Sequence, residues 1–339
     1  MRIGFLGFSH VHAEGYLALL RAMPGVEVVG FSEDGPQARD DETRTGLKHY
    51  PSAHVLLGEG LNGAIVCSET SLHRVLVEQA AAAGTPVLCE KPIATTLEDA
   101  LAMKRACDSR GVLFMTAFPM RFDSASLELR HAVQSGELGE ILGVNGVNHS
   151  ENPAAHRAWF ADPLLAGGGA VMDHVVHLVD LLRWVLKSEV VEVYAQVQRS
   201  PSSAVDTAGL LLITLGNGVQ ASIDCSWSRP ADYPRWGHLK LDIVAEHGLL
   251  VVDTFAQYLT VYASGAARSP EWRGFGADPN EAMLHSFLQA LERGAEPAVS
   301  WYDGYQALRV ALAAYESSQL GQPVRLDSAG PGIVAGNSR

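Results

Sequence analysis

The sequence has few cysteines, few lysines and no block of basic residues. Its four cysteines have neither paired spacing nor the spacing of a metal-binding finger: Cys67, Cys89, Cys107 and Cys225. This excludes a disulfide framework and indicates a reduced, cytoplasmic setting. The net charge of -13 and the scatter of the 25 lysines and arginines argue against a nucleic-acid partner, because a phosphate backbone is bound by a basic face.

Long apolar runs are also missing. No run reaches the roughly 18 apolar residues that a membrane helix needs. The first residues, MRIGFLGF, read directly as a strand and lack the charged and apolar segments of a secretory leader. We therefore expect no membrane anchor. A chain of 339 residues is longer than one ordinary core, so two domains are predicted.

The first third of the chain alternates short apolar runs with helical patterns. Strands are expected at 3–6, 26–31, 63–67, 86–89 and 112–117, and helices at 11–23, 72–83 and 97–109. This alternation predicts an α/β fold with a doubly wound parallel sheet, a Rossmann domain, over residues 1–120. Ligands of such a sheet bind beyond the carboxyl ends of its strands.

The turn after the first strand is a candidate nucleotide site. Gly7 supplies the first glycine of a G-x-G-x-x-G turn, but Ser9 and His12 stand at the second and third glycine positions. The motif alone fits either a dinucleotide turn or an ordinary tight turn. Glu33 follows the second strand, where a carboxylate binds the ribose 2′-hydroxyl of NAD and repels the 2′-phosphate of NADP. An ordinary acidic loop is the alternative.

Ionisable residues interrupt the apolar helix predicted after the glycines of AGGGAVMDHVVHLVDLLRW. Asp173 and His177 lie four residues apart, so they share one side of the helix and can share a hydrogen bond or a substrate. Histidine is suited to proton transfer near neutral pH, although a solvated pair would have the same spacing. Lys91 leaves a strand in an extended conformation imposed by Pro92, where it either binds a ligand oxygen or faces solvent.

Several motifs follow one another in an order typical of a known family. They are the Gly-x-x-Gly turn, a helix-opening His73, Glu90-Lys91-Pro92, FPMRF, LGEI, GGGAVMDHVVHLVDLLRW and AAYESSQLGQPV. From about residue 2 to 325, the chain resembles the Gfo/Idh/MocA family of nicotinamide-dependent oxidoreductases. The departures are Ser9 and His12, and Val175 where a glycine is common between the aspartate and the histidine.

The resemblance implies roles for particular residues. The lysine of EKP and the two residues of the D-x-x-x-H helix map onto a catalytic group of Lys91, Asp173 and His177. The resemblance and the predicted strand ends together suggest the following cofactor contacts: Gly7, Ser9, His10, Glu33, Ser68, His73, Glu90 and Lys91. The expected cofactor is NAD, favoured by Glu33, with NADP left open.

After residue 121 the chain has a different pattern of apolar and polar side chains. Residues 219–227 alternate apolar and polar side chains, and Asn217-Gly218 predicts a hairpin with 208–215. Further strands are expected at 141–149, 190–198, 238–245 and 249–261, with a final helix at 302–320. We predict an α+β domain over 121–326 with a large open, mostly antiparallel sheet, and a loose tail over 327–339. The resemblance implies that the free face of the sheet pairs subunits into a homodimer or homotetramer.

Substrate contacts are expected in 119–160 and 228–280, where aromatic, basic and histidine residues are scattered. The candidates are Arg121, His156, Trp159 and His174. The histidines near the glycine run lack the spacing of a metal site, so no metal is expected. The predicted function is hydride transfer between NAD(P) and a sugar, inositol or related polyol. The alternatives are an NAD-dependent glycosidase of the same family and a sugar sensor that binds the cofactor without turnover.

Overall fold

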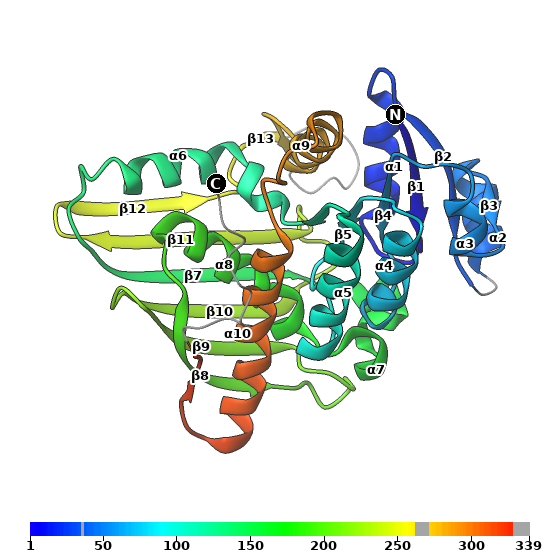
Figure 1. Cartoon of the computed structure of the whole chain (residues 1–339). Coiled ribbons are helices and arrows are strands. Elements are labelled where there is room, and N and C mark those ends of the chain that lie inside the picture. The colour runs from blue at the N-terminus through cyan, green and yellow to red at the C-terminus, as the bar shows by residue number, and fades with distance from the viewer. Residues whose placement is uncertain (35–36, 262–270, 328–339) are drawn as a thin grey trace.

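The computed structural model describes residues 1–34, 37–261 and 271–327. Within these ranges the strands form a six-stranded sheet, a seven-stranded sheet and a two-stranded hairpin, referred to below as the first sheet, the second sheet and the hairpin. Figure 1 shows the first sheet and its helices on the right, and the second sheet on the left with α8 and α10 across one face. Most of the tail expected to be loose, residues 328–339, lies outside the described ranges.

The first sheet is entirely parallel. Its order is β3 (His49–Tyr50), β2 (Glu27–Ser32), β1 (Arg2–Leu6), β4 (Gly63–Val66), β5 (Val87–Cys89) and β6 (Phe114–Thr116). The helices of this part are α1 (Ala13–Ala22), α2 (Gln37–Thr45), α3 (Ala53–Leu57), α4 (His73–Ala82) and α5 (Leu97–Arg110). Strands β4, β5 and β6 are buried throughout, as expected for a parallel sheet covered on both faces. The predicted Rossmann architecture is confirmed, and the strand order reverses between β1 and β4, where such sheets bind ligands.

The second sheet is mixed and mostly antiparallel, as predicted. Its order is β12 (Gly248–Asp253), β11 (Gly237–Ala245), β7 (Ile141–Glu151), β10 (Gln220–Arg229), β9 (Ala208–Leu215), β8 (Val190–Gln198) and β15 (Val324–Arg325). Among these pairs only β7 and β10 run parallel within the described residues.

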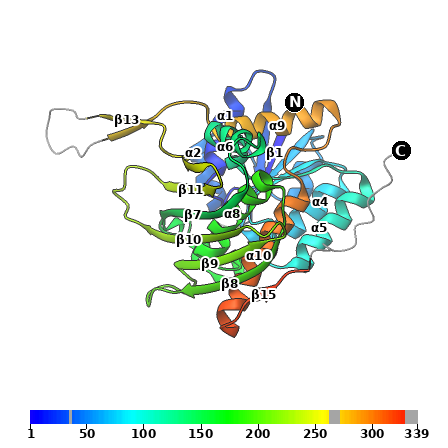
Figure 2. The same ribbon diagram turned by 90° about the vertical axis from the view of Figure 1, so that its left-hand side faces the viewer.

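One strand prediction was wrong. The strand expected over 249–261 divides into β12 and β13 (Tyr258–Val261), and β13 pairs with β14 (Glu271–Gly274) in the hairpin. The chain turns where Ala256 N donates to Asp253 O and Phe255 N donates to the Asp253 carboxylate. Figure 2 shows that β13 extends away from the body of the molecule.

Helix α8 (Ala170–Leu186) is the core helix of the second half and contacts β7, β9, β10, α6 (Ser124–Gln134) and α10 (Trp301–Leu320). The segment Pro163–Leu186, which includes α7 (Pro163–Ala166), has the length and mean hydropathy, 1.3, of a membrane-crossing helix. The expectation concerned an unbroken run of apolar residues, and Asp173 and Asp180 interrupt this segment. The most apolar part of the segment is 67% buried inside the protein, as expected for a core helix.

The last two helices contact elements of both halves of the molecule. Helix α9 (Pro279–Arg293) contacts α1 and the 3₁₀ turn η2 (Pro119–Phe122). Helix α10 contacts β6 and α5 on one side and β8 and α8 on the other. A capping box at Ser300 and Asp303 starts α10, and Gly321 ends it. Residues 279–320 therefore connect the two halves of the molecule through packing as well as through the chain.

Candidate active site

A cavity of about 520 Å³ lies where the carboxyl edge of the first sheet meets the start of α8. Polar side chains on its wall come from both halves of the molecule: His10, His12, Lys91, Asn148, Ser150, Asp173, His174, His177, Asp278 and Asn280. Apolar side chains supply much of the remaining wall: Met120, Phe160, Trp236, Leu239, Phe255 and Phe275. A few convergent polar groups on a largely apolar wall are typical of a small-molecule site.

The glycine run before α8 lets a distant carboxylate cap the helix. Asp206 accepts hydrogen bonds from the backbone N–H groups of Gly169 and Val171, both at 2.8 Å, and from the Tyr315 hydroxyl at 2.7 Å. A Cβ atom at Gly169 would lie 1.9 Å from the Asp206 carbonyl oxygen, so only glycine permits this approach. The cap satisfies N–H groups at the start of α8 and fixes the turn that carries Asp173.

Lys91 and Asp173 form an ion pair that joins the two halves. The Lys91 ammonium lies 2.5 Å from Asp173 Oδ1, and the indole N–H of Trp227 donates to Asp173 Oδ2 at 3.1 Å. Burial alone would raise the pKa of Asp173, but the Lys91 charge and hydrogen bond hold it well below its ordinary range. The carboxylate is therefore ionised at neutral pH and keeps the lysine at the cavity wall.

His177 lies one helical turn beyond Asp173 and packs against Phe118, with ring centroids 5.9 Å apart. Its Nδ1 atom is buried and has no hydrogen-bond partner among the described residues. Burial, followed by the Lys91 charge, lowers the pKa of His177 well below 6.5. The imidazole is therefore neutral near pH 7, and the residue lines the cavity. The direct bond to Asp173 that the spacing allowed is not formed, because Asp173 binds Lys91 and Trp227.

His174 also lines the cavity, as its assignment to the substrate requires. Its Nε2 atom lies 3.0 Å from the Ser150 hydroxyl and 3.8 Å from Asp173 Oδ2, and its backbone carbonyl accepts from Asn148 at 3.3 Å. Burial lowers the pKa of His174 to about 4. These contacts tie α8 to β7, so the cavity wall is rigid at this point.

The turn after β1 has the features of a nucleotide site. Gly7 has a φ of 79°, and a Cβ atom there would lie 2.4 Å from Ser68 Cβ. The buried hydroxyls of Ser9 and Ser32 have no hydrogen-bond partner among the described residues. Glu33 accepts from the backbone N–H of Phe8 at 2.9 Å. Burial, with the nearby charges of Glu69 and Asp41, raises the pKa of Glu33 to about 7.

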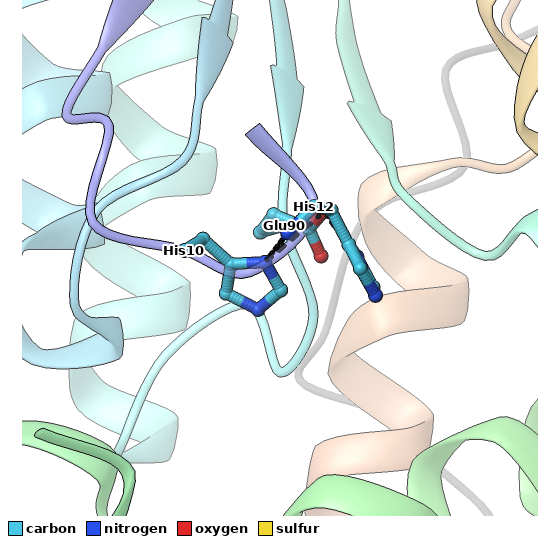
Figure 3. Close-up of side chains that lie close together, drawn as sticks. All are labelled: His10, His12 and Glu90. Atoms are coloured by element: carbon cyan, nitrogen blue, oxygen red, sulfur yellow. Dashed lines mark hydrogen bonds and ion pairs between the residues drawn. The ribbon is translucent and has the colours of Figure 1, made fainter. Parts of the chain in front are cut away.

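His10, His12 and Glu90 come together at the cavity (Figure 3). The two histidines precede α1, and Glu90 follows β5 with a fully buried side chain. Glu90 accepts from the backbone N–H of Lys91 at 3.1 Å, and its Oε1 atom lies 2.9 Å from His12 Nδ1. Burial lowers the pKa of His10 to about 3, so that imidazole is neutral near pH 7.

Two residues expected at the cofactor have partners within the protein. The buried ring of His73 lies 3.2 Å from the Ile93 carbonyl and 3.3 Å from the Ser68 carbonyl, so it bridges the two loops. The Ser68 hydroxyl donates to the Glu69 carbonyl at 3.0 Å. Neither side chain lines the cavity. Sequence position at a strand end does not distinguish such a bridging histidine from a ligand contact.

Arg121 does not reach the cavity, in contrast to its expected substrate role. Its guanidinium makes two bonds to the Asp180 carboxylate, at 2.6 and 2.7 Å, and lies 2.8 Å from Asp303. The side chains of Arg121 and Asp180 are almost fully buried. The arginine therefore neutralises carboxylates between η2, α8 and α10. Arg183 extends the network with a contact of 3.2 Å to Asp303.

Trp159 and His156 also differ from simple substrate contacts. Trp159 is buried, stacks on Phe160 and donates its indole N–H to the Ser9 carbonyl at 2.9 Å, so it braces the nucleotide turn. His156 is half exposed and pairs with Glu151 at 3.3 Å, next to the ring of Trp236. Phe160 and Trp236 lie on the cavity wall, whereas Trp159 and His156 do not.

Several residues on the cavity wall or in contact with Asp173 were not found from the sequence. Trp227 belongs to a strand that was read only for its alternation, and Asn148 and Ser150 have no motif of their own. Residues 274–280, at the base of the hairpin, contribute a rim with Asp278 and Asn280. His12 was read only as a departure from the glycine turn. Asn148, Ser150 and residues 274–280 lie within the ranges expected to contact the substrate, 119–160 and 228–280, but no motif singled them out.

Models of known families match both halves of the chain. The model described as the oxidoreductase family with an NAD-binding Rossmann fold matches residues 1–118, and the GFO/IDH/MocA C-terminal domain matches residues 126–251. The chain belongs to the Gfo/Idh/MocA family of oxidoreductases. Its Rossmann domain is of the NAD-binding kind, which agrees with the expected cofactor.

Individual relatives of this Gfo/Idh/MocA protein cover nearly its whole length. Inositol 2-dehydrogenase 3 of Saccharopolyspora erythraea is 27% identical, over 100% of this chain and 99% of the relative. Inositol 2-dehydrogenase of Acidothermus cellulolyticus is 29% identical, over 94% and 92%. Among solved structures, GenD2 from gentamicin A biosynthesis, in complex with NAD, superposes with a TM-score of 0.86 at 23% identity, covering 97% of each chain. That similarity demonstrates the shared fold.

Proposed function

We propose that this oxidoreductase transfers a hydride between NAD and a secondary alcohol of a sugar, an inositol or a related polyol. The main support is one cavity in which the Lys91–Asp173 pair and the neutral His177 lie beside the glycine turn. The names of the inositol dehydrogenase relatives agree with this substrate class. The direct test measures NADH formation with a panel of inositols, aldoses and linear polyols. A protein that binds NAD and sugar without forming NADH would instead be the sensor considered above.

Each of the three central residues has a distinct proposed role. NAD, held by the turn after β1 and by Glu33, would supply the acceptor for the hydride of the carbinol carbon. His177 accepts the hydroxyl proton, because its imidazole is neutral and the residue lines the cavity. Lys91 keeps donor capacity beyond its bond to Asp173 and stabilises the developing alkoxide. Asp173 is a positioning residue that holds the ammonium in place.

The nucleotide turn fits the dinucleotide in shape and in hydrogen-bonding capacity. We propose that residues 1–120 carry most of the cofactor site, with Gly7 and Ser9 at the pyrophosphate and Glu33 at the adenine ribose. The close packing at Gly7 and the free hydroxyls of Ser9 and Ser32 support this assignment. His10, Glu90 and Lys91 lie at the nicotinamide end of the same crevice in this proposal. The four cysteines are buried and unpaired, which agrees with a reducing, cytoplasmic location.

Above about pH 7, where Glu33 is ionised, we expect the protein to bind NADH more tightly than NADPH, because the carboxylate binds the ribose diol and would repel a 2′-phosphate. Isothermal titration with both nucleotides measures the preference. Glu33→Gln should reduce the ratio of the two affinities, while Glu27→Gln, at the exposed start of the same strand, should leave it unchanged. Tighter binding of NADPH by the unmodified protein would contradict the assignment.

We also propose that the free face of the second sheet pairs subunits. This face carries exposed apolar side chains on several strands: Leu142, Tyr194, Leu210, Leu212, Val244, Leu249 and Val251. Leu210 is 62% exposed and Leu249 is 61% exposed. These side chains lie on strands toward both ends of the sheet, and exposed apolar side chains gathered on one face favour an interaction surface.

Light scattering at micromolar concentration should therefore give a mass that is a multiple of 36.3 kDa. Leu210→Asp should shift the protein toward the monomer, because a charge would be buried in the interface. Leu164→Asp, on α7 and 82% exposed, is the matched control and should leave the mass unchanged. A purely monomeric wild-type protein would reject this proposal.

A further inference from the structure

The cluster of His10, His12 and Glu90 has the chemistry of a metal site, although the sequence predicted none. One ring nitrogen of each histidine and a Glu90 carboxylate oxygen all lie within 4.8 Å of one another. We propose that these three side chains bind one divalent transition-metal ion, with an open coordination position toward the cavity. Figure 3 shows the imidazole of His10 directed at the Glu90 carboxylate beside His12.

The charge of Glu90 supports a cation at this point. Its side chain is fully buried, and an ionised buried carboxylate is unfavourable without a positive partner. The adjacent Lys91 acts on Glu90 only at longer range, because its ammonium pairs directly with Asp173. Within the described part of the chain, the direct ion-pair partners of Glu90 are His10 and His12, with no lysine or arginine among them. A bound metal ion would provide a positive charge in direct contact with the carboxylate.

The hydrogen bonds around His10 lead to the same conclusion. The backbone N–H of His12 donates to His10 Nδ1 at 3.3 Å, so this nitrogen presents a lone pair. The same nitrogen lies 3.6 Å from Glu90 Oε1, which is also an acceptor and is too far away for a hydrogen bond. Metal–ligand distances of about 2.1 Å in a tetrahedral site place neighbouring ligand atoms roughly 3.4 Å apart. A shared cation accounts for two acceptors at this separation.

The donor set selects the class of metal. Two imidazole nitrogens and one carboxylate favour Zn²⁺ and similar first-row ions over Mg²⁺ or Ca²⁺, which prefer oxygen ligands. His12 Nδ1 and Glu90 Oε1 are hydrogen-bonded at 2.9 Å, and a metal ion would displace the proton of this bond. His10 and His12 line the cavity that also contains Lys91 and His177. With three protein ligands, the ion keeps a position for water or a ligand oxygen, as open zinc sites do.

The proposed metal site depends on a residue at which this turn departs from the glycine motif. His12 occupies the third glycine position of G-x-G-x-x-G, where a glycine would offer no ligand atom. The departure that weakened the nucleotide motif therefore supplies one of the three donors. Glycine is also the natural replacement at this position, so His12→Gly removes a ligand without adding bulk to the turn.

The test is a titration of the full-length protein, freed of metal by a chelator, with Co²⁺ as a spectroscopic probe for Zn²⁺. We expect one equivalent to bind, with visible d–d absorption bands that added Zn²⁺ abolishes. Glu90→Gln and His12→Gly should each weaken binding by about 100-fold or more, which exceeds the usual cost of removing a neighbour that only orients a ligand. His285→Ala, which removes an exposed histidine paired with Glu281 on α9, should bind like the wild type.

Two results would overturn the proposal. One is the absence of a stoichiometric Co²⁺ complex in the wild-type protein, and the other is unchanged binding in His12→Gly. If Glu90→Gln does not fold, His12→Gly decides the question alone, with its folding checked by circular dichroism. Because metal binding is read without turnover, this outcome is independent of whether the proposed polyol oxidation is correct.

Discussion

Replacing His177 by alanine is expected to lower the turnover number for alcohol oxidation by about 10²- to 10⁴-fold, the usual contribution of a general base. The affinity for NADH should stay close to that of the wild type, since the nucleotide turn and Glu33 belong to the first sheet while His177 lies on α8. Steady-state kinetics on an identified polyol and titration with NADH measure the two quantities. His54→Ala, an exposed histidine on α3, is the control.

The pH dependence provides a second readout for His177. The base must be neutral to accept a proton, and burial holds its pKa well below 6.5. Turnover of the wild type should therefore be independent of imidazole protonation from pH 6.5 upward, and should fall only at lower pH, as the ring becomes protonated. A rise in turnover centred at or above pH 6.5 would contradict this assignment, as would normal turnover in His177→Ala. Lys91 would then be the better candidate for the proton acceptor.

Replacing Arg121 by alanine is expected to lower the free energy of unfolding by about 3–5 kcal/mol. The change leaves Asp180 without its two-pronged partner and removes a contact of 2.8 Å to Asp303. Burial, opposed by the Arg121 charge, already raises the pKa of Asp180 to about 6, so this carboxylate depends on the arginine for its ionised form. Urea denaturation followed by circular dichroism measures the loss.

Two further variants separate this explanation from a general sensitivity to lost arginines. Arg121→Lys keeps the charge but not the fork geometry, so its loss of stability should be smaller than that of the alanine variant. Arg325→Ala removes an arginine that pairs with Glu192 and is 88% exposed, and should cost no more than about 1 kcal/mol. Equal losses for Arg121→Ala and Arg325→Ala would refute the proposed role of the buried network.

Periodicity predicted the first sheet well because its strands are buried on both faces and its helices separate them regularly. The strand expected at 63–67 is β4 at Gly63–Val66, and the helix expected at 97–109 is α5 at Leu97–Arg110. The pairing of β7 with β10 could not be predicted, since the two strands are far apart in the sequence and parallel pairing leaves no local turn signal. The break between β12 and β13 could not be predicted either, because residues 253–257, DTFAQ, contain no glycine or proline.

Some residues of the candidate site were predicted from the sequence and others were not. The motif around Lys91 and the spacing of Asp173 and His177 led to three residues that line one cavity. Arg121 was misread because a basic side chain after a strand looks the same whether it faces a ligand or a buried carboxylate 59 residues away. Trp159 was misread for the same reason, since its partner is the carbonyl of Ser9, 150 residues earlier. The local sequence shows which type of residue is present, whereas the group that its side chain binds depends on tertiary packing.

Helix α10 has a consequence for how such proteins can be recombined. It packs on β6 and α5 as well as on β8 and α8, and its Tyr315 hydroxyl binds the Asp206 carboxylate that caps α8. A chimera that takes residues 1–120 from one relative and the remainder from another would break the surface between α10 and the foreign first layer. Moving residues 301–320 with the Rossmann part would instead break their contacts with α8 and β8 and the bond between Tyr315 and Asp206. Exchanging cofactor preference by domain grafting therefore requires the surface of α10 to match both parents, although each half has its own sheet.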